Sequence, residues 1–503
     1  MTDTSAEAAP PATVEGYGSK GYRAYVLFAL IVVYTFNFID RSLVSVLAEP
    51  IRETFGLSDF MMGMLAGPAF AIMYTLLGIP FAMLAERRSR TWIIAWAMAA
   101  WSAMTALCGI AQNATQFALA RIGVGVGEAG CSPPSHSLIS DYFPPEKRSS
   151  ALGVFALGIP LGTMFAALGG AWIASQESLN WRDAFIWMGL PGVLGAVVFK
   201  MTVKEPPRGY SDPGGAAALA ATKRPSLFAA FRVIGGKWSF WHVSLGGGIA
   251  SFAGYGMGQF IPPFWMRAHG LDLMTAALIF GGVLGLSAGI GTFGSGLIAD
   301  RVRSRHPNSD SWLPALGLTL ATPFAIFGYN TLSFSEGTFA IILAVPALAI
   351  AALLRYSYLG PMFAVTQKLV EPRMRATAAA LLLFMINFIG YVFGPPVIGL
   401  ISDKAAGWHI ERIEAPIALS ECGPLEAALK ATRSGEEGAL EGAALEQALA
   451  TNAQYCAPAR RVGIRWAMTI GACFFLWAAL HFLLLGRTMK RDLWTPDKEP
   501  ATA

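Results

Sequence analysis

The sequence predicts an all-α integral membrane protein with twelve transmembrane helices in two pseudo-symmetric six-helix bundles. Hydrophobic residues make up 54% of the 503 residues and charged residues only 14%, whereas about a quarter of the residues of soluble domains are charged. Twelve apolar runs approach the roughly 20 residues that a bilayer-spanning helix needs. Short motifs also recur at a fixed offset in the two halves. A string of ordinary soluble domains is therefore excluded.

The apolar runs form two groups, separated by a polar stretch from Lys204 to Lys237. Residues 1–23 lack the basic start, apolar centre and cleavage site of a signal peptide, so we expect a disordered tail there. The spans are expected near residues 24–48, 61–84, 92–111, 116–140, 149–174, 183–203, 239–265, 275–299, 312–333, 338–367, 376–401 and 463–486. The predicted segments are a tail (1–23), a first bundle (24–203), a linker (204–238), a second bundle (239–487) with an extracytoplasmic insert (402–462), and a final tail (488–503).

Basic residues in the short connections gather on one side of the predicted membrane. That side holds Arg87, Arg88, Arg90, Lys147, Arg148, Arg301, Arg303, Arg305, Lys368, Arg373 and Arg375, while the other side holds Arg52, Arg182 and Arg267. Because basic loops favour the cytoplasm, we expect a multi-pass protein of the cell (inner) membrane with both termini and the linker cytoplasmic. The linker segment 227–234 suits either a short helix on the membrane surface or a plain tether.

Two motifs recur between the halves. DYFPPEKRSSALG (141–153) and KLVEPRMRATAAA (368–380) match at an offset of 227 residues. LAERRSR (84–90) and IADRVRSR (298–305) each place an acid before spaced arginines at the cytoplasmic end of a span. Two six-helix repeats are the simplest interpretation. The acid-arginine loops are candidate cytoplasmic gates, formed by Glu86, Arg87, Arg90, Asp300, Arg301 and Arg305.

Ionisable residues inside the spans indicate function, because a charge in hydrocarbon is costly unless it faces a partner or a cavity. The candidates are Asp40, Arg41, Arg121, Glu128 and Arg355. At 1.5 Å per residue, Asp40 in the first span and Arg121 in the fourth reach similar depths. Glu128 follows Arg121 by two helical turns and therefore projects from the same face. The alternatives are a structural ion pair for the acids and a snorkelling arginine for Arg355.

The segment GLIADRVRSR resembles the acid-arginine signature of the major facilitator superfamily, although Arg303 stands where the signature has glycine. The stretches FNFIDRSLVSVLAEPI and ARIGVGVGEAGCSPPSHSLISDYFPPEKR (120–148) resemble the spinster family of that superfamily. This resemblance implies a secondary transporter, with lysophospholipids and sphingosine-type lipids as the family's associated substrates. In the superfamily the acid-arginine loop pairs its acid with arginine and with a helix N-terminus, which closes the cytoplasmic side.

We therefore expect a proton-coupled transporter of amphiphilic lipids that works by alternating access. Asp40 is the expected proton switch, since burial and nearby arginines act on its pKa in opposite directions. Glu128 is expected to have a mixed role in substrate contact and proton handling. By resemblance to cavity-lining helices of the superfamily, an amphiphile is expected to meet Tyr255, Gln259, Asn387 and Tyr391. The expected partners are this substrate, protons and membrane lipids; a monomer without cofactor is expected.

Several alternatives remain open or are excluded. A proton-driven drug exporter and a symporter of small organic anions remain open. A membrane-embedded lipid-modifying enzyme or a receptor should show an intramembrane cluster of histidines and acids, and none is evident. GVGEAG (125–130) follows no strand, so a nucleotide site is rejected. The histidines lack metal-ligand spacing. The net charge of +5 comes with no separate basic domain, which argues against a nucleic-acid partner.

The insert 402–462 is rich in acids, alanine and leucine, so we expect short helices outside the membrane. It contains Cys422 and Cys456, whereas Cys108, Cys131 and Cys473 fall within predicted spans. In an oxidising exterior, Cys422 and Cys456 are the candidate disulfide pair.

Overall fold

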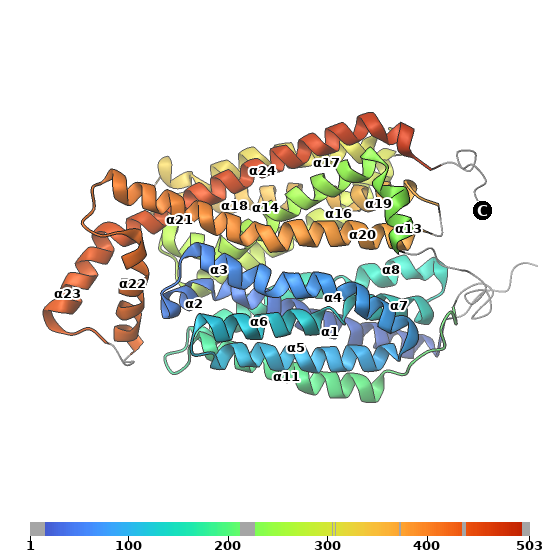
Figure 1. The fold of residues 1–503 in the computed structure, drawn as a ribbon, viewed down its shortest axis with the longest axis horizontal. Coiled ribbons are helices and arrows are strands. Elements are labelled where there is room, and N and C mark those ends of the chain that lie inside the picture. The colour runs from blue at the N-terminus through green and yellow to red at the C-terminus, as the bar shows by residue number, and fades with distance from the viewer. Residues whose placement is uncertain are drawn as a thin grey trace, which may run out of the picture.

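The computed structural model describes residues 16–211, 227–303, 305–306, 308–335, 337–371, 374–434 and 439–494. Every regular element in these ranges is a helix, which confirms the all-α prediction. Figure 1 shows the long helices side by side along the long axis of the molecule, with the first half (16–211) below the second half (227–494). The tail 1–15 of the predicted tail 1–23, and residues 495–503 of the final tail, lie outside the described residues.

Several of the six expected spans of the first half are divided into shorter helices. Side chains of Ser19, Ser58, Ser89, Asn113 and Asn180 cap helices at their N-termini, which satisfies backbone N–H groups that the helix leaves open. The helices are α1 (Lys20–Val46), α2 (Ala48–Phe55), α3 (Asp59–Ala66), α4 (Pro68–Arg87), α5 (Arg90–Ile110), α6 (Ala114–Glu128), α7 (Ser132–Tyr142), α8 (Pro145–Phe155), α9 (Gly158–Phe165), η1 (Ala166–Gly170), α10 (Ala171–Ala174) and α11 (Trp181–Thr202).

The second half repeats this arrangement and adds the insert. Its elements are α13 (Leu227–Gly235), α14 (Trp238–His269), α15 (Leu273–Ala277), η2 (Leu278–Leu284), α16 (Gly285–Arg303), α17 (Ser309–Tyr329), η3 (Thr331–Ser333), α18 (Gly337–Arg355), η4 (Tyr356–Tyr358), α19 (Leu359–Lys368), α20 (Arg375–Asn387), η6 (Phe388–Phe393), α21 (Gly394–Arg412), α22 (Leu419–Ser434), α23 (Gly442–Thr451), η7 (Asn452–Cys456) and α24 (Ala457–Asp492). The linker segment expected to be either a surface helix or a tether is helical, as α13.

Within the described residues, ten helices are long and apolar enough to cross a membrane by length and composition alone. The expected spans 116–140 and 239–265 are not in that set. The former breaks between α6 and α7 and carries Arg121 and Glu128, and the latter lies in α14, which is rich in glycine and polar residues. Both spans carry polar or charged residues expected at a functional site, and these residues lower the mean hydropathy of the span.

The helices on both sides extend into the predicted insert 402–462. α21 continues to Arg412 without a break, and α24 begins at Ala457. Polar residues occupy the extra turns, because these turns lie beyond the apolar run that marked each span. The expected short helices are α22 and α23, which project from one end of the molecule in Figure 1.

We call the end that bears α22 and α23 the insert end, and the opposite end, which bears α13 and the C-terminal region, the linker end. The two halves meet closely near the insert end, where α3 packs on α21 and α1 on α14. A Cβ atom at Gly63 would clash with the carbonyl oxygen of Pro395, and one at Gly399 with that of Asp59. Glycine is therefore required for this backbone approach.

Candidate functional site

The core of the first half contains a buried ion pair between α1 and α6. The Arg41 Nε donates to the Glu128 Oε2 at 2.5 Å, with 8% and 0% of the two side chains exposed. The Arg41 guanidinium also lies over aromatic rings of Phe38, Phe70 and Tyr74, at 4.9, 5.0 and 4.4 Å from their centroids. Carboxylate and ring faces together stabilise this cation away from water.

Asp40 and Arg121 lie beside this pair, but no arginine bonds to the Asp40 carboxylate in the described residues. Arg121 donates to the main-chain oxygen of Asp40 at 3.4 Å and stacks over Phe70 at 5.1 Å. The two carboxylate oxygens of Asp40 are buried and have no hydrogen-bond partner among the described residues, and the same holds for the Asn37 amide. Arg41 pairs with Glu128 instead of its neighbour Asp40, since consecutive residues of a helix do not face each other.

Aromatic residues connect this charged cluster to the second half. The ring of Phe70, which lies under both arginines, contacts Tyr391 at 5.9 Å between centroids. Tyr391 in turn stacks on Tyr255 at 3.7 Å. Asn387, one turn before Tyr391, is half-buried at the end of α20. Tyr255 and Tyr391 therefore lie next to the charged cluster.

Gln259 joins the halves directly. Ser45 of α1 donates to the Gln259 side-chain oxygen at 2.8 Å, and the Gln259 amide donates to the Val44 carbonyl oxygen at 3.2 Å. Its side chain is engaged by the other half, so in this conformation it is a contact between the halves.

Arg355 lies apart from the charged cluster, at the end of α18. Its Nη2 donates to the Tyr356 hydroxyl at 3.2 Å, and its guanidinium lies 4.7 Å from that ring. None of the ion pairs observed in the described part of the chain includes Arg355. Its guanidinium lies close to α14, since a Cβ atom at Gly254 would be 3.5 Å from Arg355 Nη1.

The insert end carries an ion network that the sequence did not reveal. Arg267 of α14 lies 2.6 Å from a Glu49 carboxylate oxygen and 2.7 Å from one of Asp59, so a cation of the second half bridges two acids of the first. Asp403 of α21 accepts from the backbone N–H groups of Asp59 and Phe60 at 3.0 and 2.8 Å. A carboxylate of the second half thus caps the N-terminus of α3.

These residues lie at the ends of spans, where charges are normally solvated. Only their arrangement in space distinguishes them from ordinary solvated charges. Arg52 and Arg267 entered the sequence interpretation only as loop charges. Burial raises the pKa of Glu49, but the charges of Arg267 and Arg52 outweigh burial and lower it to about 2. Glu53, which is close to Glu49 and less well paired, has a raised pKa because of its burial. The network therefore holds Glu49 as an anion.

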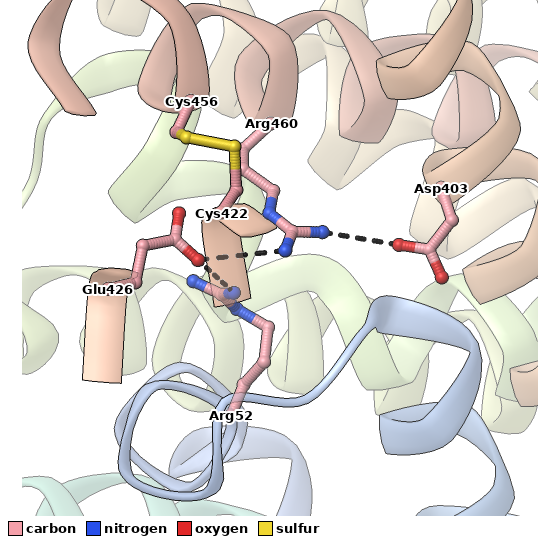
Figure 2. Close-up of a disulfide and its surroundings, with 6 residues drawn as sticks. All are labelled: Arg52, Asp403, Cys422, Glu426, Cys456 and Arg460. Carbon is pink, nitrogen blue, oxygen red and sulfur yellow. Dashed lines mark hydrogen bonds and ion pairs between the residues drawn. A yellow bond between two sulfur atoms is a disulfide. The ribbon is translucent and has the colours of Figure 1, made fainter. Parts of the chain in front are cut away.

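The insert helix α22 contributes an acid to the same ion network. Cys422 of α22 and Cys456 form a disulfide. Figure 2 shows Glu426 near this disulfide, with its carboxylate between the guanidinium groups of Arg52 and Arg460. Arg460 also reaches Asp403 at 3.2 Å.

At the linker end, the ion pairs of Arg90 and Asp310 seen in the described residues each lie within one half. Arg90 bonds to Asp141 and, at 2.7 Å, to Glu205, both in the first half. In the second half, Asp310 accepts from Arg303 at 2.6 Å and from Lys368 at 2.8 Å. Among the other candidate gate residues, Glu86, Arg87, Arg301 and Arg305 are exposed, and the Asp300 side chain lies outside the described residues.

Comparisons with known proteins agree with this architecture. The family model described as Major Facilitator Superfamily matches residues 30–395. A crystal structure of a bacterial homolog to the human lysosomal transporter spinster, inward-facing and unoccupied, shares 37% identity with a TM-score of 0.81, covering 95% of this chain and 100% of that one. An MFS-type efflux pump of Mycolicibacterium smegmatis is 35% identical over 75% of this chain and 83% of that protein. Human protein spinster homolog 1 (Homo sapiens) is 27% identical, covering 85% and 80%.

Proposed function

Because this chain belongs to the spinster family of the major facilitator superfamily, and is therefore a multi-pass membrane transporter, we propose that it moves amphiphilic lipids of the lysophospholipid or sphingosine type, coupled to protons, by alternating access. We further propose that the linker end faces the cytoplasm and the insert end the exterior. The network at the insert end then closes the outer side, and the structure corresponds to an inward-facing state.

The proposal of proton coupling rests on the difference between the two buried acids of the first half, Asp40 and Glu128. Glu128 is neutralised by Arg41 at 2.5 Å, whereas both carboxylate oxygens of Asp40 lack a partner among the described residues. A buried carboxylate without donors is costly as an anion. Asp40 is therefore the acid whose charge this conformation supports least, and we assign it the proton switch.

Glu128 suits a second role in substrate contact. A cationic headgroup competes with Arg41 for its carboxylate, while the rings of Phe70, Tyr391 and Tyr255 offer apolar faces to a chain. Arg355, with no carboxylate partner among the described residues, suits an anionic headgroup. Together these groups favour an amphiphile that carries charge over a neutral solute.

The test is transport in liposomes that contain the purified protein, with labelled lysolipid and an imposed pH difference. The unchanged protein should accumulate the lipid. Asp40→Asn should still exchange lipid across the membrane but should not accumulate it, because the driving proton has lost its site. Glu177→Gln, at an exposed position of the insert end, is the control and should accumulate lipid normally.

Two results would contradict the proposal separately. Full gradient-driven accumulation by Asp40→Asn would remove the proton assignment while leaving the substrate class intact. Failure of the unchanged protein to move any lysolipid would reject the lipid substrate. The second candidate is then drug export, which the similarity to a protein described as an MFS-type efflux pump favours.

A further inference from the structure

The insert helix α22 is attached to both halves of the transporter. On the side of the first half it contacts α2 and the turn that follows α2. Arg52 donates to the Glu426 carboxylate at 2.6 Å, and Lys430 donates to the Pro50 carbonyl oxygen at 3.1 Å. The backbones also touch, since a Cβ atom at Gly423 would clash with the carbonyl oxygen of Gly56. α22 therefore packs against α2 through charge and close backbone contact.

The attachment of α22 to the second half is covalent. The disulfide joins Cys422, near the start of α22, to Cys456, the residue just before α24. Both half-cystines are fully buried, and they form a small apolar cluster with residues of α21 and α24. The start of α22 consequently stays with α24 whichever conformation the transporter adopts.

Glu426 links two cations that belong to opposite halves. The same oxygen, Oε2, lies 2.6 Å from Arg52 of the first half and 3.6 Å from Arg460 of the second. Glu426 is 7% exposed, Arg52 2% and Arg460 4%, so solvent screens these charges little. Figure 2 shows the carboxylate between the two guanidinium groups. Without Glu426, Arg52 would lose one of its two acids and the arginines would repel each other across the boundary.

We propose that α22 is a tethered latch on the insert end, which holds α2 against the second half through Glu426 and must release Arg52 before this end opens. The disulfide keeps the latch on α24 during that opening, so Glu426 stays close enough to bind Arg52 again when the end closes. The latch therefore sets the balance between the two conformations. This inference rests on the relative movement of the halves and is independent of the identity of the substrate.

The test measures the distance between spin labels on the insert end of each half, by pulsed electron paramagnetic resonance. Labels at Ser178 and Thr338 suit this, because both residues are exposed there. The background replaces the free cysteines Cys108, Cys131 and Cys473 and keeps the disulfide. The charge-removing variant is Glu426→Gln, and the matched control is Glu421→Gln, an exposed acid of the same helix.

The proposal predicts that Glu426→Gln raises the ratio of open to closed molecules at the insert end by about tenfold, the effect of losing one hydrogen bond to a charged group. Glu421→Gln should leave the ratio unchanged. The pair Cys422→Ser and Cys456→Ser should also favour the open form, because the released α22 no longer follows α24.

Unchanged distance distributions in both Glu426→Gln and the double cysteine variant would overturn the latch, whatever their effect on lipid transport. If Glu426→Gln fails to fold, Glu426→Asp provides the same test, since it retains the charge and withdraws it by one methylene. An open fraction equal to that of the unchanged protein in Glu426→Asp would then reject the proposal.

Discussion

The two ends of the transporter use buried ion pairs differently. At the insert end, Arg267 bridges Glu49 and Asp59, and Asp403 caps α3, so each contact joins one half to the other. At the linker end, the observed pairs of Arg90 and Asp310 stay within their own half of the described chain. Charge therefore holds the halves together at one end and holds each half rigid at the other.

This difference has an energetic consequence. Removing one partner of a buried ion pair costs roughly 3–5 kcal/mol, because the remaining charge stays buried without compensation. At the insert end that cost falls on the closed conformation alone, since opening returns the charges to water. At the linker end it falls on the folded half in every conformation. The same kind of substitution should therefore shift conformation at one end and stability at the other.

The largest effect is expected from Arg267→Gln, which leaves Glu49 and Asp59 facing each other. We expect the closed conformation to lose roughly 3–5 kcal/mol, which makes the open form dominant in the label-distance measurement. Arg412→Gln, an exposed arginine at the end of α21, is the control. A closed distribution in Arg267→Gln would show that backbone packing, and not charge, closes this end.

A smaller effect, on stability and not on conformation, is expected from Arg90→Gln at the linker end. This change leaves Asp141 and Glu205 without their shared cation, so the melting temperature of the purified protein should fall by several degrees. The distance across the insert end should stay the same. Arg88→Gln, at an exposed position of the same loop that is not among the candidate gate residues, should change neither quantity. A shift in the insert-end distance in Arg90→Gln would break the contrast between the ends.

The smallest effect is expected from lowering the pH. The pKa of Glu49 is lowered from 4.5 to about 2, so its ion pairs stabilise the closed form fully above about pH 4.5 and lose strength as the pH falls toward 2. The insert-end distance should therefore be constant from neutral pH to about 5 and should lengthen below 4.5. Glu49→Gln should weaken that acid response. Opening well above pH 5 would mean that a different group controls this end.

The sequence predicted the membrane class and both six-helix bundles, because apolar runs and basic loops are local signals that survive folding. The structure and the comparisons confirm these, and the family resemblance is confirmed as well. The structure brings four of the predicted charges of the first half together: Arg121 reaches the backbone of Asp40, and Arg41 pairs with Glu128.

The insert-end network was not predictable in this way. Glu49 and Asp403 are more than 350 residues apart and look like ordinary charges at span ends, so nothing local distinguishes them from solvated residues. The choice of Glu128 over Asp40 as the partner of Arg41 depends on how α1 is rotated against α6. Packing between the helices sets this rotation, and no fixed spacing of residues in the sequence encodes it.

The π-helical turns η1, η2 and η6 lie where the halves touch, with η1 against η2 and η6 against α4. A π turn holds an extra residue and therefore rotates the side chains beyond it by roughly 100° relative to an uninterrupted α-helix. Each of these spans consequently presents one stripe of residues to the other half before the turn and a different stripe after it.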